Sequence, residues 1–146
     1  MAVVDQLTDD AVAAPAYTMR AVSPLPFDAT VAHVSEALRE QGFGVLTWID
    51  VQATMQAKLG VETPAHVILG ACRPELAHQA MSAAPSISAL LPCNVVVRDT
   101  ADGTVVEAID PQAMAQLEDH PQIAEVAAEA RTRLRAALDR IALQEA

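Results

Sequence analysis

Two cysteines, Cys72 and Cys93, have side chains that could do chemistry in this sequence. Cys72 stands in "ILGACRPELA", where an apolar strand gives way to a helix, and Cys93 stands in "LLPCNVVVRDT", where another strand begins. A thiol at a helix N-terminus has a lowered pKa, because free backbone N–H groups stabilise the thiolate. Three interpretations are open: a redox couple, part of a metal site, or two small core residues, which free cysteines often are.

A metal site built on these thiols needs a further ligand. His78 follows Cys72 on the predicted helix, so Cys72, Cys93 and His78 are the candidates for a zinc site. No CxxC or HExxH spacing supports that site. His66 and Cys72 share one predicted strand and would lie roughly 20 Å apart, too far to share one ion. The sequence therefore requires no cofactor, although zinc remains an alternative.

Three further side chains accompany the cysteines. Arg73 follows Cys72, and its guanidinium group could hold an anion. Asn94 follows Cys93, and Trp48 is a lone large ring in a chain with only 3% aromatic residues. Such a ring suits a pocket wall or a dimer contact. We expect a ligand-binding cleft formed by Cys72, Arg73, Cys93, Asn94 and Trp48. Cys72 is also the candidate nucleophile if the protein is a thiol-dependent enzyme or redox protein.

The acidic residues next to predicted helices favour structure over catalysis. Asp28, Asp50 and Asp110 each stand where a carboxylate can accept hydrogen bonds from the first free backbone N–H groups of a helix. No Ser-His-Asp order, phosphate-binding loop or GxGxxG motif is present. We therefore lean towards a non-enzymatic protein.

Charge and hydropathy argue against nucleic-acid and membrane partners. The 146 residues include 19 acidic and 9 basic side chains, a formal net charge of −10, whereas nucleic-acid binding depends on clustered Lys and Arg. No apolar run approaches the roughly 18 residues of a membrane span. The start of the chain has no basic segment of the signal-peptide kind. We expect a cytoplasmic protein whose thiols stay reduced.

The elements that position these side chains follow from apolar periodicity and turn signals. Strands are predicted over 17–22, 44–50, 66–71 and in a hairpin around "TADG", and helices over 28–41, 51–59, 74–84, from 110 and over 121–143. Alternation along 44–50 places Leu46, Trp48 and Asp50 on one face and Val45, Thr47 and Ile49 on the other.

This order of elements predicts an α+β fold, a two-layer α/β sandwich whose mixed, mostly antiparallel sheet carries helices on one face. Residues 1–14 are polar, acidic and Ala-rich, and we expect a flexible tail. Residues 15–146 form a single domain. Its C-terminal amphipathic helix, 121–143, keeps an apolar stripe over five turns and docks either on the domain itself or on a second subunit.

Four stretches carry a resemblance to a known family: "GFGVLTWIDVQATMQAKLG", "ILGACRPELAHQAM", "LLPCNVVVRDTADGTVV" and "AIDPQAMAQL". Together they cover roughly residues 35–118, and the combination of G-A-C-x-P with L-P-C-N is specific. The sequence resembles the domain of unknown function 302 family. The resemblance implies a small α/β sandwich, often dimeric, with no assigned activity.

Two positions depart from the pattern of that family. Arg73 stands where Asn is common and Trp48 where Glu is common, which puts in doubt any role of that Glu in metal binding or proton transfer. Our leading hypothesis is a homodimeric domain that binds a small ligand or ion in a cleft near the cysteines. A thiol-dependent redox protein or enzyme and a protein-interaction module are the alternatives.

Overall fold

The computed structural model describes residues 14–143, so the predicted tail over 1–14 lies outside the described residues except for Ala14. Its centre is a five-stranded sheet in the order β1-β5-β4-β3-β2, in which every neighbouring pair is antiparallel. The strands are β1 (Thr18–Ser23), β2 (Gly44–Asp50), β3 (His66–Cys72), β4 (Cys93–Thr100) and β5 (Gly103–Ile109). The predicted fold class is confirmed, and the sheet is antiparallel throughout.

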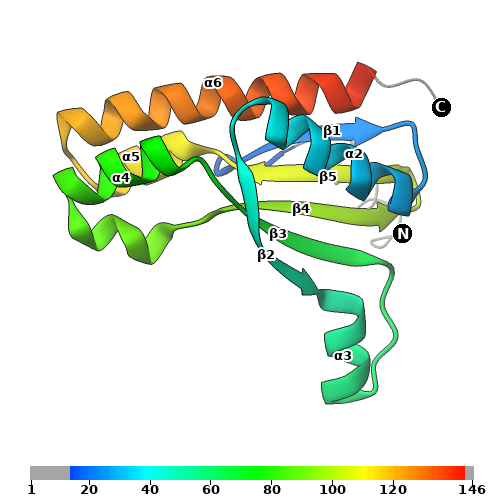
Figure 1. The fold of residues 1–146 in the computed structure, drawn as a ribbon. Coiled ribbons are helices and arrows are strands. Elements are labelled where there is room, and N and C mark those ends of the chain that lie inside the picture. Colours follow the sequence, from blue (N-terminus) through cyan, green and yellow to red (C-terminus); the bar gives the residue numbers. More distant parts are fainter. Residues whose placement is uncertain (1–13, 144–146) are drawn as a thin grey trace.

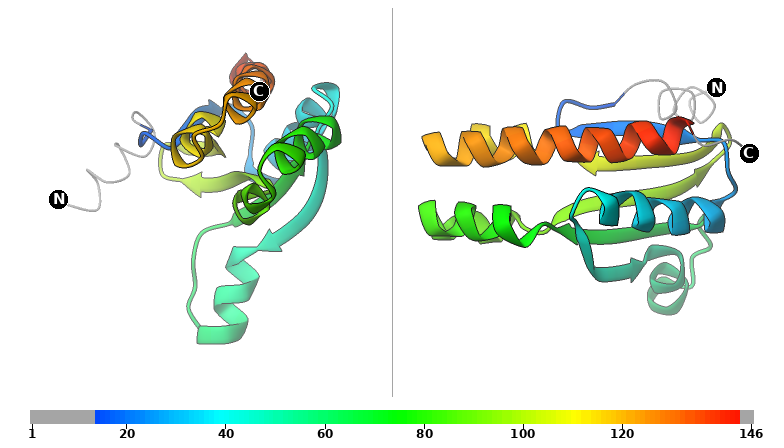
Figure 2. Two further views of the ribbon diagram at one scale, coloured as in Figure 1. Left: turned by 90° about the vertical axis from the view of Figure 1, so that its left-hand side faces the viewer. Right: turned by 45° about the horizontal axis from the view of Figure 1, so that its top comes forward.

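The helices lie on one face of this sheet, with one exception (Figure 1). They are α2 (Phe27–Glu40), α3 (Val51–Leu59), α4 (Pro74–Ala83), the 3₁₀ helix η1 (Pro85–Leu90), α5 (Pro111–Leu117) and α6 (Pro121–Leu143). The long α6 contacts α2, α4, α5 and β1. Only α3 lies outside this layer, and Figure 2 shows it projecting away from the sheet and from the other helices.

The core lies between the sheet and the helical layer. Alternate strand residues such as Leu69, Val95 and Val97 are buried on the face covered by helices, as are Leu134 and Leu138 on the apolar stripe of α6. Burying each side chain of this size contributes about 1.5–3 kcal/mol relative to exposure. The predicted stripe of the C-terminal helix is therefore confirmed, and within the described chain it packs on its own domain.

Local signals begin and end several elements as expected. The Asp50 carboxylate accepts a hydrogen bond from the Ala53 N–H at 2.9 Å, and Asp110 caps α5 through the Gln112 N–H at 3.0 Å. The C-cap of α3 is Gly60, whose φ of +66° favours glycine.

One expectation for the helices is wrong. Asp28 is not the N-cap of α2, because the helix begins one residue earlier, after Pro26, and Asp28 lies in the first turn. There its carboxylate can still interact favourably with the helix dipole. On α4, Met81 is exposed because α6 covers the side of the helix that carries Leu76 and Ala80.

A bulge changes the faces of β2. Val45 pairs with Ala71 and Thr47 pairs with Gly70, so Leu46 is an extra residue without a partner of its own on β3. An extra residue shifts the alternation that follows it. The register therefore puts Val45 on the same side as Trp48, not with Thr47 and Ile49 as alternation alone predicts.

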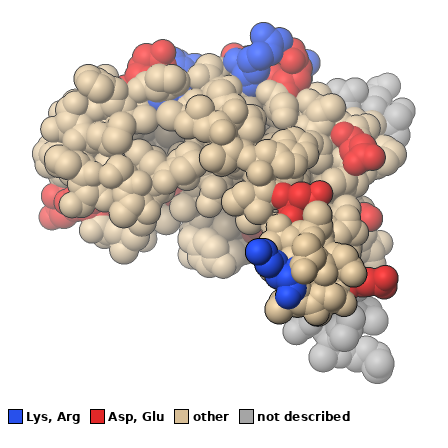
Figure 3. Space-filling view, turned by 60° about the horizontal axis from the view of Figure 1, so that its bottom comes forward, with Lys and Arg blue, Asp and Glu red and all other residues tan. Residues whose placement is uncertain are grey.

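Residues 44–65, which include β2 and α3, form a projecting segment that we call the arm (Figures 1 and 2). No residue of β2 or α3 is buried. Charged side chains are few on the face from which the arm projects (Figure 3). The arm itself contains only Asp50, Lys58 and Glu62 as charged residues.

We expect Gly70→Ala to lower the free energy of unfolding by about 1–3 kcal/mol, the usual effect of overpacking. A Cβ at Gly70 would overlap Thr47 Oγ1 and lie 2.8 Å from Pro92 Cγ. Urea unfolding followed by circular dichroism measures the loss. The double variant Gly70→Ala with Thr47→Ala removes the first clash and should recover part of it. Equal stability of the single and double variants would contradict this contact.

Candidate functional site

The two cysteines lie on neighbouring strands but face opposite sides of the sheet. Cys93 pairs with Ala71 and is buried with it in the core. Cys72 is the next residue along β3, so strand alternation directs its side chain to the other face. Both thiols are free. A disulfide needs Cβ atoms that point towards each other, so a bond between these two would require the backbone to move.

The protein environment makes both thiols weaker acids. Burial, with the nearby Glu75 carboxylate, raises the pKa of Cys72. Burial raises the pKa of Cys93 to about 11, with a further contribution from Cys72. The lowered pKa expected for Cys72 at the start of α4 is therefore wrong, because burial and the Glu75 carboxylate both disfavour the thiolate.

The candidate zinc ligands are not brought together. Cys93 faces the core, Cys72 faces the opposite side, and His78 is exposed on α4. Within residues 14–143, no three His, Cys, Asp or Glu side chains lie close enough to hold a metal ion.

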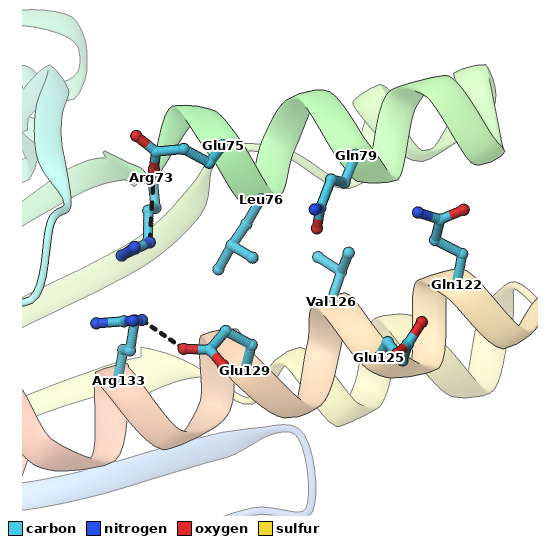
Figure 4. Close-up of a pocket in the computed structure, with 9 residues that line it drawn as sticks. All are labelled: Arg73, Glu75, Leu76, Gln79, Gln122, Glu125, Val126, Glu129 and Arg133. Atoms are coloured by element: carbon cyan, nitrogen blue, oxygen red, sulfur yellow. Dashed lines mark hydrogen bonds and ion pairs between the residues drawn. The ribbon is translucent and has the colours of Figure 1, made fainter.

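Arg73 lies at one end of a groove between α4 and α6 (Figure 4). The groove has a volume of about 400 Å³, and its lining residues are Arg73, Glu75, Leu76, Gln79, Gln122, Glu125, Val126, Glu129 and Arg133. In Figure 4, Leu76 and Val126 point towards each other across its middle. Arg73 and Arg133 occupy one end, and Gln79, Gln122 and Glu125 lie towards the other. Seven of the nine lining residues are polar or charged, so the groove suits a polar ligand.

Both arginines of the groove are held in place. Arg73 donates from Nη1 to the Gln41 carbonyl at 3.3 Å, and its Nε lies 3.5 Å from Glu75. A Cβ on Gly42, whose φ is +84°, would lie 2.8 Å from Arg73 Nη1, so this glycine makes room for the guanidinium group. Arg133 pairs with Glu129 at 2.6 Å. Each guanidinium has five N–H donors, so these contacts leave donors for a ligand.

Asn94 belongs to a second hollow, on the sheet face opposite the helices. This hollow measures about 350 Å³ and is lined by Tyr17, Thr18, His66, Asn94, Val96, Arg98, Glu107 and Ile109. At its side the Glu107 carboxylate accepts hydrogen bonds from Thr18 at 2.6 Å, Arg20 at 2.7 Å and Arg98 at 3.0 Å. Burial alone would raise the pKa of Glu107, but these three donors together hold it below its ordinary value.

Sequence analysis missed this ion network. Arg20, Arg98 and Glu107 come from three different strands and share no motif. Strand alternation could have placed each on a face, but only the sheet order β1-β5-β4 brings the three together.

The five predicted site residues are thus spread over separate surfaces of one chain. Trp48 is 58% exposed on the arm. Arg73 lines the groove between helices, Cys93 faces the core and Asn94 faces the open side of the sheet. Their role in binding a ligand stays a prediction.

Comparison with known proteins identifies the family. A model of the domain of unknown function DUF302 matches residues 19–141. The chain belongs to the DUF302 family. This confirms the resemblance and extends it beyond residues 35–118. Among solved structures, the DUF302 domain is similar to the crystal structure of an uncharacterized conserved protein DUF302 from Bacillus stearothermophilus. The two share 27% identity over 87% of this chain and 99% of that chain, with a TM-score of 0.81.

No curated protein matches this chain. Across the described residues, its helices are too short or too polar to cross a membrane.

Alkylation tests the acidity of the two thiols in the DUF302 domain. We expect iodoacetamide to modify both slowly at pH 7, because the reactive thiolate is scarce when the pKa is raised. Cys93 should be the slower of the two, and its rate should rise steeply only in denaturant. Mass spectrometry of samples taken over pH 6–10 measures both rates. Rapid alkylation of Cys72 at pH 6, relative to a small-molecule thiol, would contradict this expectation.

The Glu107 network should contribute to stability. We expect Glu107→Gln to lower the free energy of unfolding at pH 7 by roughly 2 kcal/mol, because charge-assisted hydrogen bonds to three donors are weakened.

The effect of Glu107→Gln on stability should depend on pH. The pKa of folded Glu107 lies below its ordinary value of 4.5. Its stabilising effect is therefore complete above about pH 4.5 and is lost as the pH falls through the folded-state pKa. The stability difference between wild type and Glu107→Gln should shrink on acidification, as urea unfolding at pH 3, 4, 5 and 7 can measure. Glu36→Gln, in an exposed pair with Arg39, is the control and should change stability little.

Proposed function

We propose that this DUF302 domain is a non-enzymatic, homodimeric protein that binds a small polar molecule in the groove between α4 and α6, which is lined by Arg73, the residue after Cys72 in the sequence. The observation that carries the ligand part is the groove itself, with two fixed arginines at one end. Its volume of about 400 Å³ lies in the range of small-molecule sites. Two free cysteines accord with a reducing, cytoplasmic location.

The charges that line the groove favour a ligand with two charged ends. The lining includes two arginines and three glutamates. Arg73 and Arg133 each have one glutamate partner, whereas no ion pair joins Glu125 to another described residue. A simple anion would also be repelled by the net charge of −10 that the chain carries. A zwitterion avoids that repulsion, because its carboxylate can lie between the arginines and its ammonium group near Glu125.

The rest of the groove fits the same class of ligand. Leu76 and Val126 offer an apolar contact to a short aliphatic chain that joins the two charged groups (Figure 4). Gln79 and Gln122 add amide donors and acceptors at the end away from the arginines. We therefore propose a small amino acid with separated carboxylate and ammonium groups as the ligand class.

Thiol chemistry, the rival hypothesis, receives less support. Both thiol pKa values are raised, and the two side chains face opposite sides of the sheet. A catalytic thiol normally has a lowered pKa. We therefore assign the cysteines to packing within the proposal.

NMR titration of the ¹⁵N-labelled protein tests the ligand class. The probes are 4-aminobutyrate and 6-aminohexanoate, with butyrate and butylamine as single-charge controls. We expect saturable shifts of amides on α4 and α6 at millimolar concentrations of a zwitterion, and weaker shifts with the single-charge probes. Replacing both groove arginines, Arg73→Gln with Arg133→Gln, should abolish them. Arg39→Gln changes an exposed arginine on α2 and should leave them intact.

Two results would contradict the proposal. The first is the absence of saturable shifts with any probe. The second is an unchanged titration of the Arg73→Gln, Arg133→Gln variant, provided that its circular dichroism spectrum matches that of the wild type.

A further inference from the structure

The arm, residues 44–65, has the features of an unpaired docking surface. We infer that a second copy of this chain docks on it, with the two β2 strands side by side and antiparallel about a two-fold axis. This inference rests on the homodimer part of the proposed function and gives that dimer an interface.

The apolar side chains of the arm are not part of the hydrophobic core. Its exposed large hydrophobic residues are Val45, Leu46, Trp48, Ile49, Leu59 and Val61. Leu46 is 65% exposed and Trp48 58% exposed, although both belong to a strand of the sheet. Exposed apolar side chains gain no hydrophobic stabilisation. Large apolar patches on a protein surface mark interaction sites.

The outer edge of β2 is open. β2 is the last strand in the sheet order, and no strand of the described chain pairs with its outer side. Proteins usually protect such an edge with lysine, proline or a bulge. β2 contains neither lysine nor proline, and its bulge at Leu46 leaves Thr47–Asp50 in regular register. The single charge in the strand, Asp50, is engaged as the cap of α3.

The charge of the arm favours a second copy over a partner of opposite charge. The whole chain carries a net charge of −10, and two such chains repel each other over most of their surfaces. The arm has one positive and two negative residues, Lys58, Asp50 and Glu62, so little repulsion arises there. A basic partner would instead be attracted to the acidic body of the domain.

The symmetry of the proposed strand pairing and the size of the arm also favour a second copy of this chain as the partner. A two-fold axis brings one surface against itself, and an antiparallel pair of identical strands satisfies this requirement. The arm has roughly 20 residues, close to the roughly 20–30 residues that each side of a stable interface contributes. Trp48 would lie near the centre of this contact, where aromatic side chains typically supply much of the binding energy.

Sedimentation equilibrium tests this interface with matched variants. We expect the wild type to have twice the 15.4 kDa mass of the chain. Leu46→Glu places a charge in the proposed interface and should weaken the dimer at least 100-fold. Leu117→Glu makes the same change at a leucine that is 74% exposed on α5, outside the arm, and should leave the dimer intact. Ile49→Lys is a second arm variant with the opposite charge.

Trp48 also reports the contact directly, because it is the only tryptophan in the chain. Its fluorescence emission should move to longer wavelength as the wild type is diluted and the dimer dissociates. In Leu46→Glu the emission should lie at the longer wavelength at every concentration.

The outcomes separate the inference from the proposed function. A wild type that is monomeric at all concentrations overturns both the interface and the homodimer. A dimer that Leu46→Glu and Ile49→Lys weaken no more than Leu117→Glu does would leave the homodimer standing but overturn the arm as its interface. An emission maximum that does not change while the wild-type dimer dissociates would overturn the interface as well.

Discussion

The packing of α6 across one face of the sheet is the contact on which the rest of this structure depends. The helix contacts α2, α4, α5 and β1, and so it holds the helical layer together. Leu134 and Leu138 are buried against the core. Polar contacts add to this packing: Arg131 pairs with Asp110 at the start of α5, and Arg140 pairs with Glu40 at the end of α2. Most of the stabilisation comes from the buried apolar stripe, since surface ion pairs contribute little.

The groove between α4 and α6 follows from that packing. Leu76 and Val126 point towards each other between the two helices, and the polar side chains of the groove lie to either side of this apolar pair (Figure 4). Below it, a small apolar hollow lined in part by Cys93 belongs to the core. One helix pair therefore separates a polar, accessible surface from the buried thiol. This separation explains why Arg73, the residue after Cys72 in the sequence, can contribute to a binding surface while Cys93 contributes to packing.

The helical layer covers only part of the sheet, and the two uncovered regions differ in chemistry. On the face opposite the helices, Arg20, Glu107 and Arg98 make a largely buried polar network beside apolar side chains such as Val96 and Ile109. At the β2 edge, the uncovered side chains are apolar. The β2 edge, which has no such polar network, is the region suited to burial against another chain.

The helices and strands of this protein could be predicted from the sequence, because their signals are local. Periodicity located β2, β3, the hairpin and the helix over 121–143, and the capping roles of Asp50 and Asp110 depend on neighbouring backbone N–H groups. The motifs around Cys72 and Cys93 also identified the family. The α+β class followed from the order of the elements.

Which of these residues lie close together depends on long-range contacts in the folded chain. The bulge at Leu46 depends on pairing with β3 and changed the face on which Val45 lies. Burial raised the thiol pKa of Cys72 where the helix N-terminus alone predicts a decrease. The groove of Arg73 needs α6, which lies far along the chain. Strand order, register and burial arise from long-range contacts, and no local pattern in the sequence specifies them.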